Sequence, residues 1–227
     1  MAGLLVSVDV EASGPCPRYG DMISFGAVVI EPTFSWQFYS DIMRPECENF
    51  EQEAYDSIGM TREEHDYKHN PSISNSINRF SSWCGQLKQA SQADRLIMVS
   101  DNPGFDFQWM NYECWDKIGY NPFGHTARKI GDVWSGLRTR HYETAGWKRY
   151  RRTKHTHNAL DDALGNAEAW LDMWLTYGGR EIHKEIEKLR VRFQQISDEH
   201  KPRCREILDI PDSLDNSIGL GDNWPRL

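Results

Sequence analysis

Residues 4–11 read Leu4-Leu5-Val6-Ser7-Val8-Asp9-Val10-Glu11, an apolar run that ends in two acids. A short run of apolar and β-branched residues is typical of a buried strand. Asp9 and Glu11 are two residues apart, so their side chains point to the same face of that strand. Two neighbouring carboxylates on a buried face repel each other and lose hydration. The stretch therefore predicts either a strand end with both acids in water or a site that binds a cation.

The rest of the chain predicts an α/β fold, with a mixed sheet flanked by helices. Further strands are expected at residues 22–30, 36–42, 96–99 and 129–132. Helices are expected at residues 107–118 and 160–177, from Val133 onward, and behind Asn70-Pro71, where asparagine would cap the helix. An amphipathic stripe at residues 182–196 is expected either to pack on the core or to join two subunits. We expect one domain at residues 1–179 and a C-terminal extension at residues 180–227, with an irregular tail from Lys201.

Length and composition exclude several classes of protein. The chain has 227 residues, 39% of them hydrophobic and 26% charged, which suits one folded domain. No apolar run is long enough to span a membrane, and no basic region precedes the first apolar run, so neither a membrane partner nor a secretory signal is expected. The five cysteines are scattered and form no C-x-x-C pair, which argues against disulfides and structural zinc and favours the cytoplasm.

Charge is unevenly distributed along the chain. The net charge of −8 argues against a protein that binds nucleic acid over its whole surface. Residues 46–66, the acidic segment, contain eight acids and one base. Residues 138–157, the basic segment, contain seven lysines and arginines against one acid, interleaved with Tyr142, Trp147 and Tyr150. This second segment is either a solvated loop or a surface that contacts phosphates and stacks bases.

Further candidate acids occur in the middle of the chain and in its second half. Asp106 follows the strand expected at residues 96–99 through a short loop, and His157 precedes the adjacent acids Asp161 and Asp162 at the start of a helix. Taken alone, each acid could simply favour a helix N-terminus through the helix dipole.

Together, three motifs in this order resemble the DEDDh family of 3′→5′ exonucleases. They are Val8-Asp9-Val10-Glu11, Asn102-Pro103-Gly104-Phe105-Asp106 and His157-Asn158-Ala159-Leu160-Asp161-Asp162. The resemblance covers residues 4–177 and implies a ribonuclease-H-like fold. Two longer phrases, residues 21–26 and 155–162, resemble a bacterial and phage branch of the family. The chain departs from many members by having Ala12-Ser13-Gly14 after the glutamate, where they have threonine, and Ser24 where they have glutamate.

The resemblance implies a metal-dependent active site. Asp9, Glu11, Asp106 and Asp162 would bind two divalent cations, Mg²⁺ or Mn²⁺, because hard cations prefer oxygen ligands. His157 would be the general base, since its ordinary pKa lies near neutrality. His155 is the alternative base, ranked lower because only His157 has the family's spacing to Asp162. The expected substrate contacts are Ser13, Gly14, Asn102, Phe105, Arg149, Arg151 and Arg152.

The expected function is hydrolysis of single-stranded nucleic acid from its 3′ end, with release of nucleoside 5′-monophosphates. Two alternatives remain open: a non-catalytic module or accessory subunit that binds nucleic-acid ends, and a phosphodiesterase that acts on small nucleotides. The choice between RNA and DNA depends on contacts to a 2′-hydroxyl, and no residue can be assigned to them from sequence. Because several family members act as homodimers, a homodimer is also expected.

Overall fold

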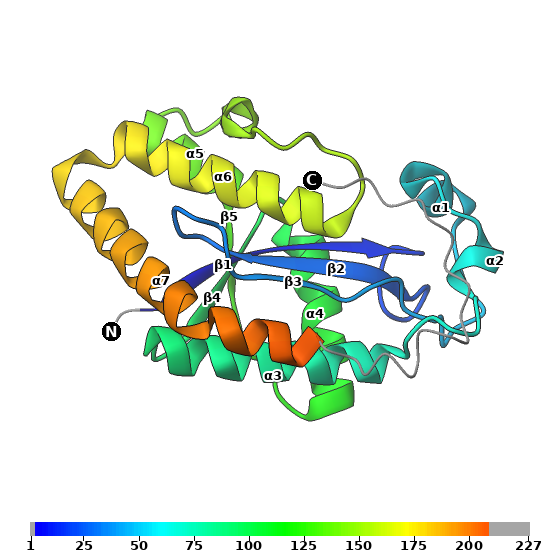
Figure 1. The fold of residues 1–227 in the computed structure, drawn as a ribbon. Coiled ribbons are helices and arrows are strands. Elements are labelled where there is room, and N and C mark those ends of the chain that lie inside the picture. Colours follow the sequence, from blue (N-terminus) through cyan, green and yellow to red (C-terminus); the bar gives the residue numbers. More distant parts are fainter. Residues whose placement is uncertain (1–2, 209–227) are drawn as a thin grey trace.

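The computed structural model describes the backbone of residues 3–208 and the side chains of residues 3–196. Five strands form one mixed sheet in the order β3-β2-β1-β4-β5, with β1 at its centre (Figure 1). β1 pairs antiparallel with β2 and parallel with β4, while β3 and β5 extend the sheet at its two sides. The strands are β1 (Leu4–Ala12), β2 (Met22–Val29), β3 (Gln37–Tyr39), β4 (Leu96–Ser100) and β5 (Ala127–Lys129). The predicted α/β architecture is therefore confirmed.

Helices cover both faces of the sheet (Figure 1). On one face, α3 (Ile73–Ser91) and α4 (Pro103–Ile118) pack against a core that contains Val6, Val8 and Val10 of β1. On the other face, α5 (Ile130–Arg138) and α6 (Ala159–Tyr177) form a second core, against which Leu5 packs. Because side chains alternate along a strand, Asp9 and Glu11 share the Leu5 face and point toward α6.

The C-terminal helix α7 (Gly179–Leu208) packs back on the protein's own core. Phe193 and Ile196 are buried in the core on the α3 side, and Ile186 packs on the core on the α6 side. This is one of the two outcomes expected for the amphipathic stripe. The expectation of an irregular tail from Lys201 is wrong for residues 201–208, where good helix formers follow the proline and the helix continues. The rest of the expected tail, 209–227, lies outside the described residues, and the domain boundary at residue 179 stays a prediction.

Several element boundaries differ from those expected. Helix α3 is capped by Ser72, whose hydroxyl accepts the Asn75 N–H, whereas Asn70 donates its side-chain amide to the carbonyls of two residues of the preceding helix. Helix α4 begins at Pro103, a proline suited to the first turn, and not at residue 107. Helix α5 begins at Ile130, directly after β5, where a strand to residue 132 was expected.

Both charged segments contain structure that the sequence did not predict. The acidic segment contains α1 (Gln52–Ile58) and α2 (Arg62–His65), and the basic segment contains a 3₁₀ turn, η1 (Gly146–Tyr150). The Asp21 carboxylate accepts the backbone N–H groups of Glu46 and Cys47, which ties the acidic segment to the loop between β1 and β2. None of the described helices is both long enough and apolar enough to cross a membrane.

Candidate active site

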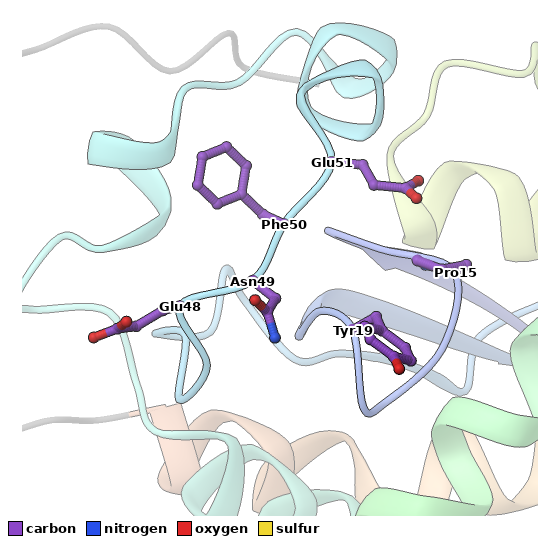
Figure 2. A pocket seen from close by; sticks show the side chains of 6 residues that line it. All are labelled: Pro15, Tyr19, Glu48, Asn49, Phe50 and Glu51. Carbon is purple, nitrogen blue, oxygen red and sulfur yellow. The ribbon is translucent and has the colours of Figure 1, made fainter.

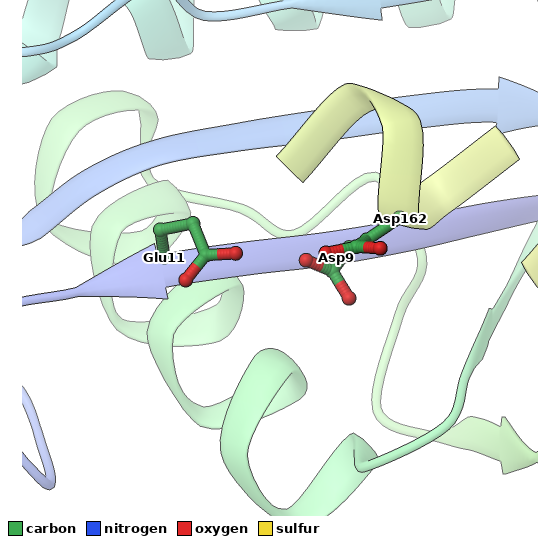
Figure 3. Close-up of side chains that lie close together, drawn as sticks. All are labelled: Asp9, Glu11 and Asp162. Carbon is green, nitrogen blue, oxygen red and sulfur yellow. The ribbon is translucent and has the colours of Figure 1, made fainter. Parts of the chain in front are cut away.

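Three of the predicted carboxylates come together where α6 crosses the central strand. One carboxylate oxygen from each of Asp9, Glu11 and Asp162 lies within 4.8 Å of the others, and Figure 3 shows Asp162 reaching from the helix toward the strand. The close approach of α6 depends on Gly26, which pairs with Asp9 across the sheet. A Cβ at Gly26 would lie 2.4 Å from the Ala159 carbonyl oxygen, so only glycine allows the helix to begin there.

Asp106 joins this group from the first turn of α4. Its carboxylate accepts the Val10 N–H at 3.1 Å and also accepts a hydrogen bond from the Ser100 hydroxyl. Asp101, which the sequence indicates only as a loop residue, also contributes: oxygens of Asp9, Asp101 and Asp106 lie within 4.8 Å of one another. From sequence it lies only in the loop after a predicted strand, a position that does not distinguish it from an ordinary turn residue. The carboxylate cluster thus consists of Asp9, Glu11, Asp101, Asp106 and Asp162.

Burial makes the charged form of these acids costly. Burial, reinforced by the charges of Asp106 and Glu11, raises the pKa of Asp9 well above its usual range. Burial raises the pKa of Glu11 to about 8, with the charge of Asp162 acting in the same direction. Burial raises the pKa of Asp106 to about 7, against the lowering effect of its hydrogen bond from Ser100. A convergent set of buried carboxylate oxygens fits hard divalent cations such as Mg²⁺ or Mn²⁺.

The Asp162 carboxylate also accepts hydrogen bonds from the segment that precedes α6. Arg151 donates to its Oδ1 at 2.6 Å, and His155 Nδ1 lies 2.9 Å from the same oxygen. The backbone N–H groups of Thr156 and His157 donate to Oδ1 and Oδ2 at 3.3 and 3.0 Å. From sequence, Arg151 is expected to contact phosphate. The structure places it on a carboxylate of the active site, so a phosphate contact would have to compete with this pair.

The two histidines lie together at the mouth of the site. Both rings are exposed, with centroids 4.3 Å apart, and the Nδ1 of His155 lies beside Asp162. His157 adopts a left-handed backbone conformation with φ of 57°, and Asn158 then caps α6 by accepting the N–H groups of two following residues. The general base can therefore come from either of two adjacent imidazoles, and the assignment to His157 stays a prediction.

A pocket adjoins the cluster beside Glu11. Its volume is about 280 Å³, and Phe105 from α4 and Ala54 and Ile58 from α1 contribute apolar walls. Phe105, which is expected from sequence to contact substrate, also packs on the core, with its ring 6.2 Å from the Trp109 ring. Helix α1 is a wall of the site that the sequence does not predict.

A second pocket, of about 420 Å³, continues outward from the first and shares Pro15 and Glu51 with it. Figure 2 shows that its lining comes from the loop after β1, with Pro15 and Tyr19, and from the segment that leads into α1. The two hollows together extend from Glu11 to the surface, bounded by the acidic segment.

Other residues expected to contact substrate have roles within the fold. The buried Ser13 hydroxyl bonds to the backbone N–H and carbonyl of Asp21. A Cβ at Gly14 would lie 2.0 Å from the Tyr19 carbonyl oxygen, so the loop requires glycine. Asn102 is exposed and precedes α4 as its N-cap residue. Substrate contacts by Ser13, Gly14 and Asn102 stay predictions.

The remaining two predicted arginines lie exposed on the basic segment. The Arg149 guanidinium stacks over the Trp134 and Tyr150 rings, 4.9 and 5.1 Å from their centroids. Arg152 lies over the Phe34 ring and 3.6 Å from the Glu168 carboxylate. Both guanidiniums are held by rings near the surface, where they are accessible to an anionic polymer.

Comparisons with known proteins agree with this geometry. The family model RNase_T, described as "Exonuclease", matches residues 6–169. The chain is 29% identical over 176 residues to the 3'-5' DNA exonuclease Cap18 of Escherichia coli, covering 73% of this chain and 88% of that protein. It also resembles the nuclease domain of 3'hExo, a DEDDh family member solved with rAMP (TM-score 0.59, 15% identity, 77% of this chain and 93% of the other). The structure of E. coli Exonuclease I with a dT13 oligonucleotide is similar as well (TM-score 0.55, 14% identity, 80% of this chain and 43% of the other).

Proposed function

The chain belongs to the RNase_T exonuclease family, and on that premise we propose that it is a divalent-metal-dependent 3′→5′ exonuclease of single-stranded nucleic acid. The observation that carries this proposal is the carboxylate cluster. It consists of two overlapping groups, Asp9-Glu11-Asp162 and Asp9-Asp101-Asp106, which share Asp9. Two groups of oxygen ligands with one shared residue suit the binding of two cations.

The bound cations would lower the pKa of an attacking water, stabilise charge on the scissile phosphate and bind the leaving oxygen. The protein's own residues would bind the cations and accept the proton. Asp9, Glu11, Asp106 and Asp162 would hold the cations, and Asp101 would offer a further ligand oxygen beside Asp9 and Asp106. His157 accepts the proton of the attacking water at its exposed imidazole, which can then release the proton to solvent.

The pocket beside Glu11 suits the 3′-terminal nucleotide. It adjoins the ligands, and the Phe105 ring with the apolar side chains of α1 offers a surface for a base. Arg152 lies beside Glu168, and Arg149 lies beside Tyr177 at the C-terminal end of α6, whereas Asp162 is in the first turn of that helix. These arginines would therefore contact backbone phosphates at a distance from the scissile bond. Because the acidic segment lines the outer hollow, a duplex with two phosphate chains is a poorer substrate than one strand.

We propose DNA ends as the substrate, since the relative at 29% identity is named as a DNA exonuclease. The experiment is a panel of matched single-stranded DNA, single-stranded RNA, blunt duplex and 3′-overhang substrates with Mg²⁺ or Mn²⁺. Each substrate carries a label at a known end, and Asp106→Asn serves as the inactive control. Faster release of nucleoside 5′-monophosphates from the single-stranded DNA and the overhang supports the proposal. Tight binding of ends without cleavage would instead favour the accessory module, and cleavage confined to dinucleotides would favour the small-nucleotide phosphodiesterase.

Two further proposals concern assembly and location. A homodimer stays a prediction, and the described part of the stripe on α7 that motivated it packs on the protein's own core. A dimeric mass by light scattering at working concentration would support it, and a monomeric mass would remove it. A cytoplasmic location, proposed from the scattered cysteines, is tested by fractionation.

A further inference from the structure

We propose that Arg151 is a positioning residue for the metal ligand Asp162, and that the metal affinity of the site depends on it. This inference rests on the proposed function, because it concerns the cations of that site. Arg151 has no part in the three motifs that identify the site from sequence. Its role follows from its contacts in the fold.

The pair between Arg151 and Asp162 is buried and short. Arg151 Nη2 lies 2.6 Å from Asp162 Oδ1, and the exposed fractions of the two side chains are 9% and 0%. Buried charge-assisted hydrogen bonds of this kind are strong and directional. Removal of one partner from a buried ion pair leaves the other charge uncompensated, which costs far more than loss of a surface pair.

A glycine in α6 makes room for the guanidinium. Gly165 lies three residues after Asp162 and therefore on the same side of the helix. A Cβ there would lie 2.5 Å from Arg151 Nε and 2.7 Å from Nη2. The guanidinium thus lies directly on the helix surface, in a place that a larger residue at position 165 would fill.

The chain around Arg151 is fixed by further contacts. Arg151 Nε donates to the Thr153 carbonyl at 3.3 Å, and the Glu168 carboxylate accepts the N–H groups of Arg152 and Thr153 at 2.8 Å each. Glu168 belongs to α6, as Asp162 does. The helix therefore binds the segment at two places, and Arg151 contributes to one of them.

Arg151 and His155 both contact the same oxygen of Asp162, but of these two side chains only that of Arg151 is buried. The His155 side chain is 55% exposed and is free to move when a cation binds, whereas the Arg151 side chain is 9% exposed. The other oxygen, Oδ2, accepts the His157 N–H and has a second lone pair, so a cation can bind Oδ2 while Arg151 keeps its hydrogen bond to Oδ1. Such outer partners orient a ligand, and their loss commonly lowers metal affinity by about 10–100-fold.

The test measures metal binding without substrate. The thermal unfolding midpoint of the full chain is followed as MnCl₂ or MgCl₂ is added, for wild type, Arg151→Met, Arg151→Lys and Arg140→Met. Arg140 is a matched control for charge, since its side chain is 68% exposed and lies on the same basic segment. We expect Arg151→Met to raise the metal concentration for half-maximal stabilisation by about 10–100-fold. Arg151→Lys should give a smaller increase, because the charge remains without the planar fork, and Arg140→Met should match wild type.

Gly165→Ala provides a second variant that keeps the arginine. Alanine favours the helix but displaces the guanidinium, so it should raise the half-maximal metal concentration without weakening the helix. An unchanged concentration in both Arg151→Met and Gly165→Ala would overturn the inference and leave Arg151 with a purely structural role. A decrease would also overturn it, because Arg151 would then compete with the cation. If wild type itself shows no stabilisation by metal, the proposed function fails rather than this inference alone.

Discussion

The carboxylate of Asp106 accepts the backbone N–H of Val10, the residue between Asp9 and Glu11, at 3.1 Å. This bond joins the first turn of α4 to the central strand at the point where the strand presents its two acids. Two motifs 96 residues apart in sequence are thereby held in one fixed arrangement. The carboxylate cluster is consequently held in part by hydrogen bonds of the fold itself.

Replacing Asp106 or Asp162 by asparagine should affect the stability of the protein in different ways. Asp106→Asn can still accept the Val10 N–H and donate to Ser100, and it removes a repelling charge, so the metal-free protein should unfold at the same or a higher temperature. Asp162→Asn leaves the Arg151 charge buried without its partner, so that variant should unfold at a lower temperature. Both should lose most nuclease activity. Thermal unfolding with a chelator, combined with turnover in Mg²⁺, checks this prediction; near-wild-type turnover in either variant would refute the assignment of the site.

The stability of the metal-free protein should fall as the pH rises from about 5 to about 8. Burial raises the pKa of Glu11 to about 8 and that of Asp106 to about 7, whereas both lie near 4 in an unfolded chain. The folded state therefore binds more protons in this range, and its advantage is lost as the pH passes through the folded-state pKa values.

The measurement compares unfolding midpoints at about pH 6 and about pH 8 with and without Mg²⁺. Cations favour the ionised acids, so stabilisation by Mg²⁺ should be larger at the higher pH. Glu11→Gln, which cannot ionise, should show a smaller loss of metal-free stability over the same range. A variant that is as sensitive to pH as wild type would show that Glu11 does not contribute.

His157→Ala should lower kcat by about 10²–10⁴-fold and change oligonucleotide binding little, because a general base acts at the chemical step. His155→Ala is the matched comparison, since its ring lies beside that of His157 and contacts Asp162. We expect a smaller loss of kcat for His155→Ala. Single-turnover rates for the two variants decide the assignment, and the reverse order would make His155 the base.

Replacing Arg149 and Arg152 together by methionine should raise KM and nearly preserve kcat, since phosphate contacts act in ground and transition states alike. The salt dependence of binding should weaken by about 0.7 in log–log slope for each phosphate of a single strand that the variant no longer neutralises. Arg151 is left in place because its replacement would disturb Asp162 as well. If KM and the slope of the salt dependence are the same in variant and wild type, these arginines make no contact with phosphate.

The sheet was predictable because local patterns determine it, and the four motif acids were predictable because three short motifs together resemble a known family. Alternation along Leu4–Ala12 placed Asp9 and Glu11 on one face. Asp106 and Asp162 look like ordinary acids at helix starts, and the resemblance to the DEDDh family singled them out. Helix α1 was not predictable, because its seven residues are too few for a clear periodic pattern and its start is fixed by a distant contact, the hydrogen bond from the Glu51 N–H to the Ser13 carbonyl. A charged segment without periodicity gives no indication of such contacts.

The roles of Asp101 and Arg151 could not be predicted for a related reason. Asp101 looks like a turn residue until the fold places it beside Asp9 and Asp106. Arg151 belongs to a run of basic residues in which each arginine looks equivalent. Its burial against Gly165 and its pair with Asp162 distinguish it from Arg149 and Arg152, and both features exist only in the folded protein.

The most direct test of the central claim is the degradation of a 5′-labelled single-stranded DNA oligomer by wild type and Asp106→Asn, with Mg²⁺ and then with a chelator. We predict a ladder of labelled fragments that shorten from the 3′ end, formed only by wild type and only with the cation. A ladder of the same rate in the chelator or in Asp106→Asn, or release of the 5′ label as a mononucleotide in the first turnovers, would contradict the proposed activity.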